Sequence, residues 1–252
     1  MSELATIILA AGKGTRMNSD LPKVLHRING KPMINYVIQS AQDLGSHRII
    51  VVVGHQHELV KTIVRNDFSH NRDKMIEFVT QKSQLGTAHA VLQTAWTLKE
   101  FEGNVLVLSG DVPLIRSETL KEMLKIHHQT NAICTVMTSI TDNPTGYGRI
   151  IRSFDGMLDK IVEEKDIQTD DIRNINEINC GIYLFRAENL FTTLPKVDND
   201  NKQQEYYLPD VIKIMIQENM NISVFQVDDM SETHGINTPE QLKEIEKLMK
   251  TK

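Results

Sequence analysis

The first half of the chain alternates short, continuous apolar runs with segments of helical periodicity. The apolar runs cover residues 6–10, 49–53, 75–79 and 105–108, and none of them alternates with polar residues. Strands that are covered on both faces have this pattern. Between the first two runs, Pro32 begins a segment with apolar residues at helical spacing, and Gly45 ends it. This alternation predicts right-handed crossover connections and a mainly parallel sheet.

The second half of the chain predicts a different arrangement. Residues 132–140, 148–152, 158–163 and 179–185 have the composition of strands, and Asp155-Gly156 is typical of a hairpin turn. Polar residues fill 165–176 and 198–204, which predicts exposed loops, the first long enough for a binding loop or lid. Residues 205–219 predict a helix, and Thr238-Pro239-Glu240-Gln241 predicts the start of a last helix with a capping box.

Together these patterns predict one α/β domain over residues 1–252, with three layers in the order α/β/α. The sheet is expected to be mixed and mainly parallel, with an inserted antiparallel region that covers its carboxyl edge. A length of 252 residues with 40% hydrophobic residues is sufficient for a continuous core.

The charge and hydropathy of the chain limit the kinds of molecule that it is expected to bind. A net charge of −5 disfavours a nucleic-acid partner but permits a local cluster of cations that binds a nucleotide. No apolar run approaches the ~20 residues of a membrane helix, and no basic region precedes the short apolar run at the amino terminus. Cys134 and Cys180 lie in strand-like sequence, where reduced core cysteines are expected. We therefore expect a cytoplasmic protein with no membrane partner.

The loop after the first apolar run carries the strongest chemical signal. It reads Leu9-Ala10-Ala11-Gly12-Lys13-Gly14-Thr15-Arg16-Met17, and Lys23 follows shortly after. Gly12 and Gly14 let the backbone turn and bring its N–H groups close to phosphate oxygens. The spacing fits neither the dinucleotide fingerprint nor the P-loop. A turn that only relieves backbone strain would contain the glycines without needing Arg16 and Lys23, so the loop predicts a polyphosphate site.

A carboxylate is expected at the same edge of the sheet. Asp111 follows the run at 105–108 and the flexible Gly110, so its side chain should emerge beside Gly12. Oxygen ligands of this kind are those that Mg²⁺ prefers, with water and substrate phosphates completing the shell. The alternative is an aspartate that only forms the turn before Pro113.

The glycine loop and the following Leu21-Pro22-Lys23 resemble the sugar-nucleotide pyrophosphorylases. The closest resemblance is to the uridyltransferase domain of the bifunctional UDP-N-acetylglucosamine pyrophosphorylase/glucosamine-1-phosphate N-acetyltransferase family. Further matching segments follow in the same order along nearly the whole chain. They are Gln81 with Gln84-Leu85-Gly86-Thr87, Gly110-Asp111-Val112-Pro113-Leu114, Pro144-Thr145-Gly146-Tyr147-Gly148-Arg149-Ile150, Ile161-Val162-Glu163, Glu177-Ile178-Asn179, Glu205-Tyr206-Tyr207 and Gly235-Ile236-Asn237.

The resemblance implies a Rossmann-like nucleotidyltransferase fold and a role for each matching residue. Residues 1–112 would bind the nucleotide, 113–237 the sugar phosphate, and 238–252 would form the carboxyl-terminal helix. For catalysis it implies Arg16, Lys23 and Asp111, and for the metal Asp111 and Asn237. For the nucleotide it implies Leu9, Ala10, Ala11, Gly12, Lys23, Gln81, Gly86 and Thr87. For the sugar phosphate it implies Ser109, Gly110, Gly148, Glu163 and Asn179.

The implied reaction is magnesium-dependent uridylyl transfer from UTP to N-acetylglucosamine-1-phosphate, a step toward the cell-wall precursors of peptidoglycan and lipopolysaccharide. Since a phosphate monoester has its second pKa near ~6, it needs no general base, and the main obstacle is repulsion between anions. Mg²⁺, Arg16 and Lys23 would lower that repulsion. Two alternatives remain open, namely a related transferase with another base or sugar, and a nucleotide-sugar sensor without turnover.

Two departures from the family pattern matter. Ser109 stands where a tyrosine is expected before Gly110, which removes an aromatic contact with substrate. The chain ends at Lys252 without the β-helix of the bifunctional family. We therefore expect neither the acetyltransferase activity nor the β-helix trimer interface.

Overall fold

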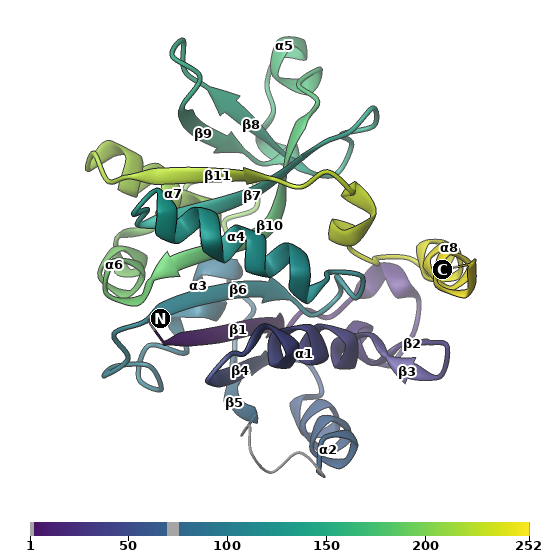
Figure 1. Ribbon diagram of the computed structural model, residues 1–252. Coiled ribbons are helices and arrows are strands. Elements are labelled where there is room, and N and C mark those ends of the chain that lie inside the picture. The colour runs from purple at the N-terminus through teal and green to yellow at the C-terminus, as the bar shows by residue number, and fades with distance from the viewer. Residues whose placement is uncertain (1–2, 70–75, 252) are drawn as a thin grey trace.

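A mixed β-sheet forms the centre of the computed structural model, which describes residues 3–69 and 76–251 (Figure 1). Seven of its nine described strands follow the order β11-β7-β10-β6-β1-β4-β5, while β8 pairs with β10 and β9 with β8. Strands β6, β1, β4 and β5 are parallel, and β10 is antiparallel to both β6 and β7. The strand bounds are β1 Leu4–Ala10, β4 Arg48–Val53, β5 Ile76–Thr80, β6 Asn104–Ser109, β7 Cys134–Ile140, β8 Gly148–Arg152, β9 Leu158–Val162, β10 Glu177–Arg186 and β11 Ile222–Gln226, with β2 Arg27–Ile28 and β3 Lys31–Pro32 in a separate ribbon.

Helices cover both faces of this sheet. Helices α1, α2 and α4 pack on one face, and α3, α6 and α7 pack on the other. Neighbouring residues of β1 enter the two cores in turn, since Ile7 faces one and Ile8 the other, both fully buried. This explains why the central strands lack polar alternation, and it confirms the predicted three-layer fold. The helix bounds are α1 Met33–Leu44, α2 His57–Asp67, α3 Thr87–Leu92, α4 Ser117–Gln129, α5 Asp170–Arg173, α6 Ala187–Thr193, α7 Leu208–Gln217 and α8 Pro239–Thr251, with 3₁₀ helices η1 Thr15–Met17, η2 Lys23–Leu25, η3 Glu164–Asp166, η4 Leu194–Lys196 and η5 Met230–Thr233.

The order of the central strands contains a switch point, where the succession of strands across the sheet changes direction. From β1 the chain runs outward to β4 and β5, and then returns to place β6 on the other side of β1. Open α/β sheets bind their ligands at such a switch point, outside the carboxyl ends of the strands. The loops after β1 and β6 meet here, where the N–H of Gly110 donates to the carbonyl of Leu9 at 2.9 Å. The switch point thus brings the glycine loop and Asp111 to one edge.

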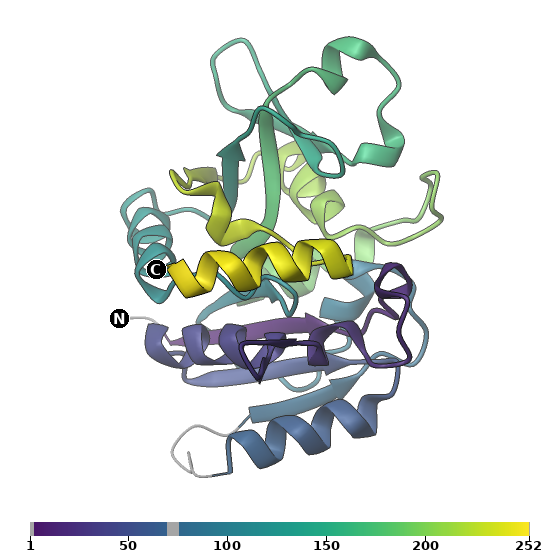
Figure 2. The same ribbon diagram turned by 90° about the vertical axis from the view of Figure 1, so that its right-hand side faces the viewer.

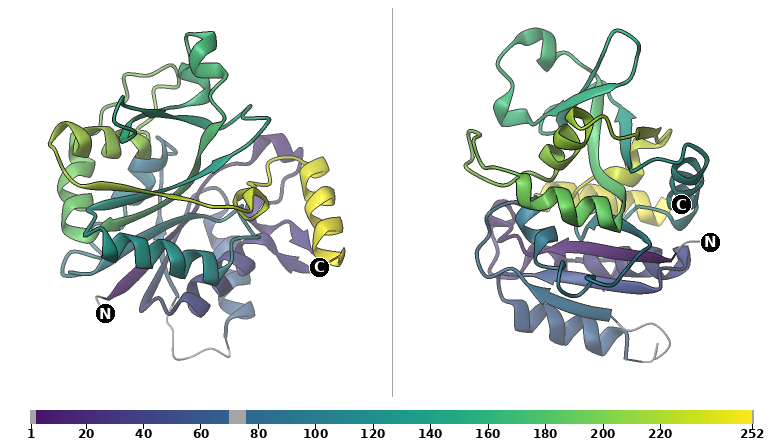
Figure 3. Two further views of the ribbon diagram at one scale, coloured as in Figure 1. Left: turned by 45° about the horizontal axis from the view of Figure 1, so that its top comes forward. Right: turned by 90° about the vertical axis from the view of Figure 1, so that its left-hand side faces the viewer.

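The second half of the chain builds an antiparallel region beyond β6. Strands β8 and β9 form a hairpin through the predicted turn at Asp155-Gly156, and β8 pairs with β10 (Figure 3). The pairing of β10 with β7 shifts register between Asn179 and Tyr183, and Gly181 has a φ of +71° within this irregularity. A bulge of this kind bends the strand and redirects its side chains. It lies where β10 faces the carboxyl edge of β6.

Several predicted boundaries are wrong or incomplete. Helix α7 begins at Leu208 and not at residue 205, because the backbone of Tyr206 pairs with the carbonyl of Leu85 and the N–H of Ala88. Strand β7 begins at Cys134, and β11 was not predicted, since its five residues form a partly exposed edge strand with a weak pattern. The predicted loop at 165–176 contains η3 and α5. Met75, predicted as the start of a strand, lies outside the described residues.

The last helix is confirmed with its capping box. Gln241 donates its N–H to Thr238 Oγ1 at 3.3 Å, and its Oε1 accepts the N–H of Thr238 at 3.2 Å. Figure 2 shows α8 in yellow lying beside the purple segment that contains the β2–β3 ribbon. Ile245 of α8 packs there in a small core with Ile28 and Ile236. Helix α8 therefore fixes the segment just before it, which carries Asn237.

Replacing Gly86 with alanine should destabilise the fold. The backbone of Gly86 has a φ of +113°, and an added Cβ would lie 2.4 Å from the carbonyl oxygen of Tyr206. Strain and overpacking together predict a loss of roughly 3 kcal/mol in the free energy of unfolding, measured in urea. Gly30→Ala is the control, since Gly30 has a φ of +82° with nothing within 4 Å of the added Cβ. It should lose only about 1 kcal/mol, and equal losses would contradict the clash.

Candidate active site

A cleft with about 310 Å³ of free space opens at the carboxyl edge of β1 and β6. Its walls come from both halves of the chain. The first half contributes Leu9, Thr87, Ser109, Asp111 and Val112. The rest come from the start of β8 and the loop before it, Glu163 after β9, the β10 bulge, the loop before α7 with the start of that helix, and the region from the end of η5 to Gly235. Six of the predicted sugar-phosphate and nucleotide residues line the cleft together. They are Leu9, Thr87, Ser109, Gly148, Glu163 and Asn179, and Asp111 joins them.

Charged and amide side chains from four separate segments converge beside this cleft. Lys23 Nζ forms an ion pair with Asp111 Oδ2 and also donates to Asn237 Oδ1 at 3.0 Å. Arg16 Nη2 donates to the same Asn237 oxygen at 2.9 Å. Arg16 lies on η1, Lys23 on η2, Asp111 after β6 and Asn237 before α8. The four residues predicted for catalysis and metal binding thus form one cluster.

The donor set of this cluster fits a divalent cation. The carboxylate of Asp111 and the amide oxygen of Asn237 converge on a single positive group, the ammonium of Lys23. Both are hard oxygen donors of the kind that Mg²⁺ prefers. Within residues 3–69 and 76–251, no group of three or more His, Cys, Asp or Glu side chains is arranged to hold a metal. An ion bound between Asp111 and Asn237 would therefore take its other ligands from water and phosphate oxygens.

Other residues of the glycine loop after β1 differ in how closely the protein surrounds them. Ala10 and Ala11 are buried below the loop, and Gly12 is exposed with nothing within 4 Å of an added Cβ. A Cβ on Gly110, by contrast, would lie 3.1 Å from the carbonyl oxygen of Leu9. The strand ends therefore meet closely, while the tip of the loop stays open to a ligand.

Gln81, Gly86 and Thr87 lie together at the start of α3. The side-chain nitrogen of Gln81 bonds to the carbonyl of Gly86 at 3.0 Å and to His89 Nδ1 at 2.9 Å. Both amide hydrogens of Gln81 are thereby committed within the protein, and Gln81 is only 3% exposed. Thr87 Oγ1 accepts the N–H of Leu208 at 2.9 Å and so caps α7 from a distant segment. This connects the predicted base site to the opposite wall of the cleft.

Gly148, Glu163 and Asn179, which are predicted for the sugar phosphate, stand together. A Cβ on Gly148 would lie 3.1 Å from Glu163 Oε1, so a larger residue would crowd the carboxylate. Asn179 Nδ2 donates to Tyr183 Oη at 2.6 Å, and its Oδ1 accepts the N–H of Gly181 at 3.1 Å. The β10 bulge therefore holds the amide in one orientation.

The pKa of Glu163 is raised to about 7. Burial is the main cause, followed by the nearby carboxylates of Asp166 and Asp210, while a hydrogen bond from Asn179 opposes the rise. A carboxyl group in this state is balanced between its neutral and charged forms at neutral pH. It can donate to or accept from a hydroxyl group on a ligand.

Arg149 holds the loop that carries Glu163. Its guanidinium is only 1% exposed, forms an ion pair with Glu164 at 2.8 Å and donates to the carbonyl of Tyr147. It also donates to the carbonyl of Arg173, at the end of α5, at 3.4 Å. One buried cation thus ties the segment predicted as a lid to the strand that carries Gly148.

Several lining residues were not among the predicted site residues. Gln203 and Tyr207 lie on the wall opposite β6, and Gln203 Nε2 donates to Tyr207 Oη at 2.6 Å. Tyr147, Cys180 and Tyr183 line the other walls. Burial raises the pKa of Cys180 to about 12, so this free cysteine stays a thiol. Tyr147 and Tyr207 fall inside the segments that match the family, and this match could have identified them as site residues. Cys180 and Tyr183 reach the cleft because of the β10 bulge, which the sequence did not predict.

Comparison with known families classifies the chain. A family model described as nucleotidyl transferase matches residues 5–231, and the chain belongs to this family. It is a nucleotidyltransferase enzyme. Enzymes of the family generally use a divalent metal.

Individual relatives show which members of this family the chain is similar to. The bifunctional protein GlmU of Bacillus thuringiensis (strain Al Hakam) is 45% identical over 252 residues, covering 100% of this chain and 53% of the relative. The bifunctional protein GlmU of Bacillus cereus (strain G9842) gives the same values. The chain thus spans about half the length of these curated relatives. A solved structure of UDP-glucose pyrophosphorylase complexed with UDP-glucose matches with a TM-score of 0.77 and 19% identity, covering 100% of this chain and 99% of the other, which supports the fold.

None of the helices in the described parts of the chain has the length and apolar character needed to span a bilayer.

Stability should depend on pH through Glu163. A carboxyl group whose pKa rises on folding adds stability below its ordinary pKa of 4.5, and that stability is lost as pH rises through about 7. Glu163→Gln keeps the side-chain shape without the titration. We therefore expect its melting temperature, relative to the unsubstituted protein, to be higher at pH 8 than at pH 5 by at least ~2 °C.

Glu58→Gln is the control for this measurement. The pKa of Glu58, on α2, is lowered by its hydrogen bond and ion pair with Lys61, so its effect has the opposite sign. A melting difference for Glu163→Gln that is the same at both pH values would contradict the proposed burial of this carboxyl group.

Proposed function

We propose that this protein transfers a uridylyl group from UTP to N-acetylglucosamine-1-phosphate in a magnesium-dependent reaction. The products are UDP-N-acetylglucosamine and pyrophosphate. The observation that supports this most strongly is the cluster of Arg16, Lys23, Asp111 and Asn237 beside a cleft at the switch point of the sheet. The matching segments of the sequence supply the choice of base and sugar.

The proposed reaction does not depend on a general acid or base. An oxygen of the sugar phosphate forms a bond to the α-phosphorus of UTP, and the bond from that phosphorus to the bridging oxygen of pyrophosphate breaks. The attacking monoester is largely deprotonated at neutral pH, since its second pKa is near ~6. The task for the protein is to hold anions in line against their repulsion.

Arg16 and Lys23 are the groups suited to this task. Arg16 is exposed, so its planar fork of donors can bind phosphate oxygens. Lys23 is a movable point charge that is paired with the oxygens of Asp111 and Asn237. Asp111 and Asn237 would hold a magnesium ion, which supplies charge neutralisation at the phosphate oxygens when bound.

The two walls of the cleft suggest how the substrates divide. In our proposal the glycine loop, Gln81 and Gly86 bind the nucleotide within residues 1–112. Gly148, Glu163 and Asn179 bind the acetylated sugar within residues 113–237, and Ser109 and Gly110 lie between the two. We also propose a cytoplasmic site of action, where UTP is made and where the two free cysteines stay reduced.

Arg16→Ala should lower the rate of pyrophosphate release by at least ~10²-fold, the loss expected when one donor to transition-state charge is removed. A coupled pyrophosphate assay with UTP and N-acetylglucosamine-1-phosphate measures this effect. Addition of EDTA to the unsubstituted enzyme should abolish the signal, and excess Mg²⁺ should restore it.

The control is Arg27→Ala, which removes an exposed arginine that donates to Gly30 in the β2–β3 ribbon. It should retain near-normal turnover. Near-normal turnover in Arg16→Ala as well would remove the role assigned to Arg16. A clear preference for CTP or dTTP, or for another sugar phosphate, would favour a related transferase, while tight product binding without any pyrophosphate exchange would favour a sensor.

A further inference from the structure

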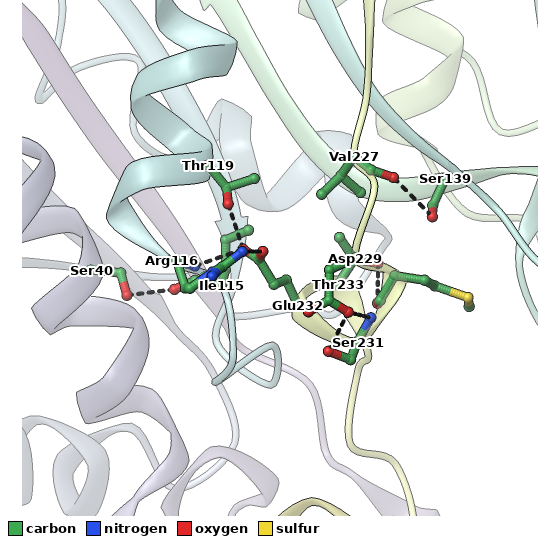
Figure 4. Close-up of polar contacts among 11 residues, drawn as sticks. Ser40, Ile115, Arg116, Thr119, Ser139, Val227, Asp229, Ser231, Glu232 and Thr233 are labelled. Atoms are coloured by element: carbon green, nitrogen blue, oxygen red, sulfur yellow. Dashed lines mark hydrogen bonds and ion pairs between the residues drawn. The ribbon is translucent and has the colours of Figure 1, made fainter. Parts of the chain in front are cut away.

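The segment that carries Asn237 has little regular structure of its own. It leaves β11, passes through the short η5 and reaches Asn237 two residues before α8. At its start, the N–H of Val227 donates to the carbonyl of Thr138 at 2.8 Å, and Ser139 Oγ donates to the carbonyl of Val227 at 3.4 Å (Figure 4). Beyond that point, the position of the segment depends on a few individual contacts.

Glu232 makes the most heavily bonded of these contacts. Its side chain is only 3% exposed, although an ionised carboxylate is costly to bury. Its Oε2 accepts the N–H of Arg116 at 3.2 Å and the hydroxyl of Thr119 at 2.6 Å, and its Oε1 forms an ion pair with the Arg116 guanidinium (Figure 4). Three donors of this kind satisfy the buried carboxylate.

All three donors belong to the start of α4. Arg116 is the residue that precedes the helix, and its side chain makes no capping hydrogen bond of its own. The first N–H groups of a helix lack partners within it, and the amino end of a helix favours negative charge. Glu232 thus caps α4 from a segment far away in the sequence. This fastens η5 to the beginning of α4.

A second link lies close to the cluster of site residues. The N–H of Ile236 donates to the carbonyl of Asp111 at 2.9 Å, and Ile236 is fully buried. The segments 111–119 and 232–237 are therefore joined at both ends, by Asp111 with Ile236 and by the start of α4 with Glu232. Ser40 Oγ donates to the carbonyl of Ile115 at 2.6 Å, which holds the first segment against α1 (Figure 4).

We propose that Glu232 is a positioning residue that sets the separation between Asp111 and Asn237. It contacts no predicted substrate group and acts through the segment that leads to Asn237. The role rests on the proposed function, in which Asp111 and Asn237 hold the magnesium ion. Loss of the Glu232 link should let the Asn237 segment move away from Asp111 while the sheet stays intact.

The test combines a readout without substrate and one with it. Hydrogen exchange of the ligand-free protein should show the Ile236 amide exchanging at least ~10-fold faster in Glu232→Ala, while the amides of β1 and β6 keep their rates. The Mg²⁺ concentration for half-maximal pyrophosphate release should rise at least ~5-fold in the same variant. Glu232→Gln keeps one acceptor oxygen, which can still bond the Arg116 N–H and the Thr119 hydroxyl, and loses only the ion pair, so both effects should be smaller.

Two further variants keep the test decisive. Glu118→Gln alters an exposed carboxylate in the first turn of the same helix, and should change neither readout. If Glu232→Ala does not fold, Arg116→Ala removes the ion pair through a mostly exposed side chain and should shift both readouts in the same direction.

An unchanged Ile236 exchange rate in folded Glu232→Ala or Arg116→Ala would overturn the proposal. Faster exchange throughout the molecule with an unchanged Mg²⁺ requirement would also overturn it. The exchange readout needs no substrate, so it stays interpretable if no sugar phosphate supports turnover and the proposed function itself fails.

Discussion

The pairing of Lys23 with the oxygens of Asp111 and Asn237 is the interaction on which the site depends. Each of these residues comes from a different segment, and each segment is held in place by other contacts. The close approach of Gly110 to Leu9 fixes Asp111, and α8 and Glu232 fix Asn237. The two oxygen donors around the Lys23 ammonium mark a position that stabilises positive charge. The proposed chemistry, which brings two anions together, needs positive charge at that position.

The architecture explains how distant segments reach this position. The reversal of strand order between β1 and β6 brings two loops to one edge, and the antiparallel β10 carries the second half of the chain back over it. Thr87 then caps α7 and Glu232 caps α4, each from another part of the chain. Backbone groups at helix ends, which need partners in any case, thereby join segments that are far apart in the sequence.

The sequence was sufficient to predict the layers, the parallel core and the edge at which Gly12 and Asp111 lie, because local apolar runs determine these features. It was insufficient where structure depends on distant pairing. The helix expected from residue 205 starts later because the backbone of Tyr206 pairs with Leu85 and Ala88. The bulge at Asn179 arises from its pairing with β7, and the burial of Glu232 depends on donors from α4. A single sequence carries no local signal for contacts of this kind.

The most direct test of the central claim is a crystal structure with a UTP analogue and Mn²⁺ in place of Mg²⁺, with the ion located by its anomalous scattering. We expect one ion about 2.1 Å from oxygens of both Asp111 and Asn237, with Lys23 turned toward phosphate. An ion bound to the nucleotide alone, with Lys23 still bridging Asp111 and Asn237, would contradict it.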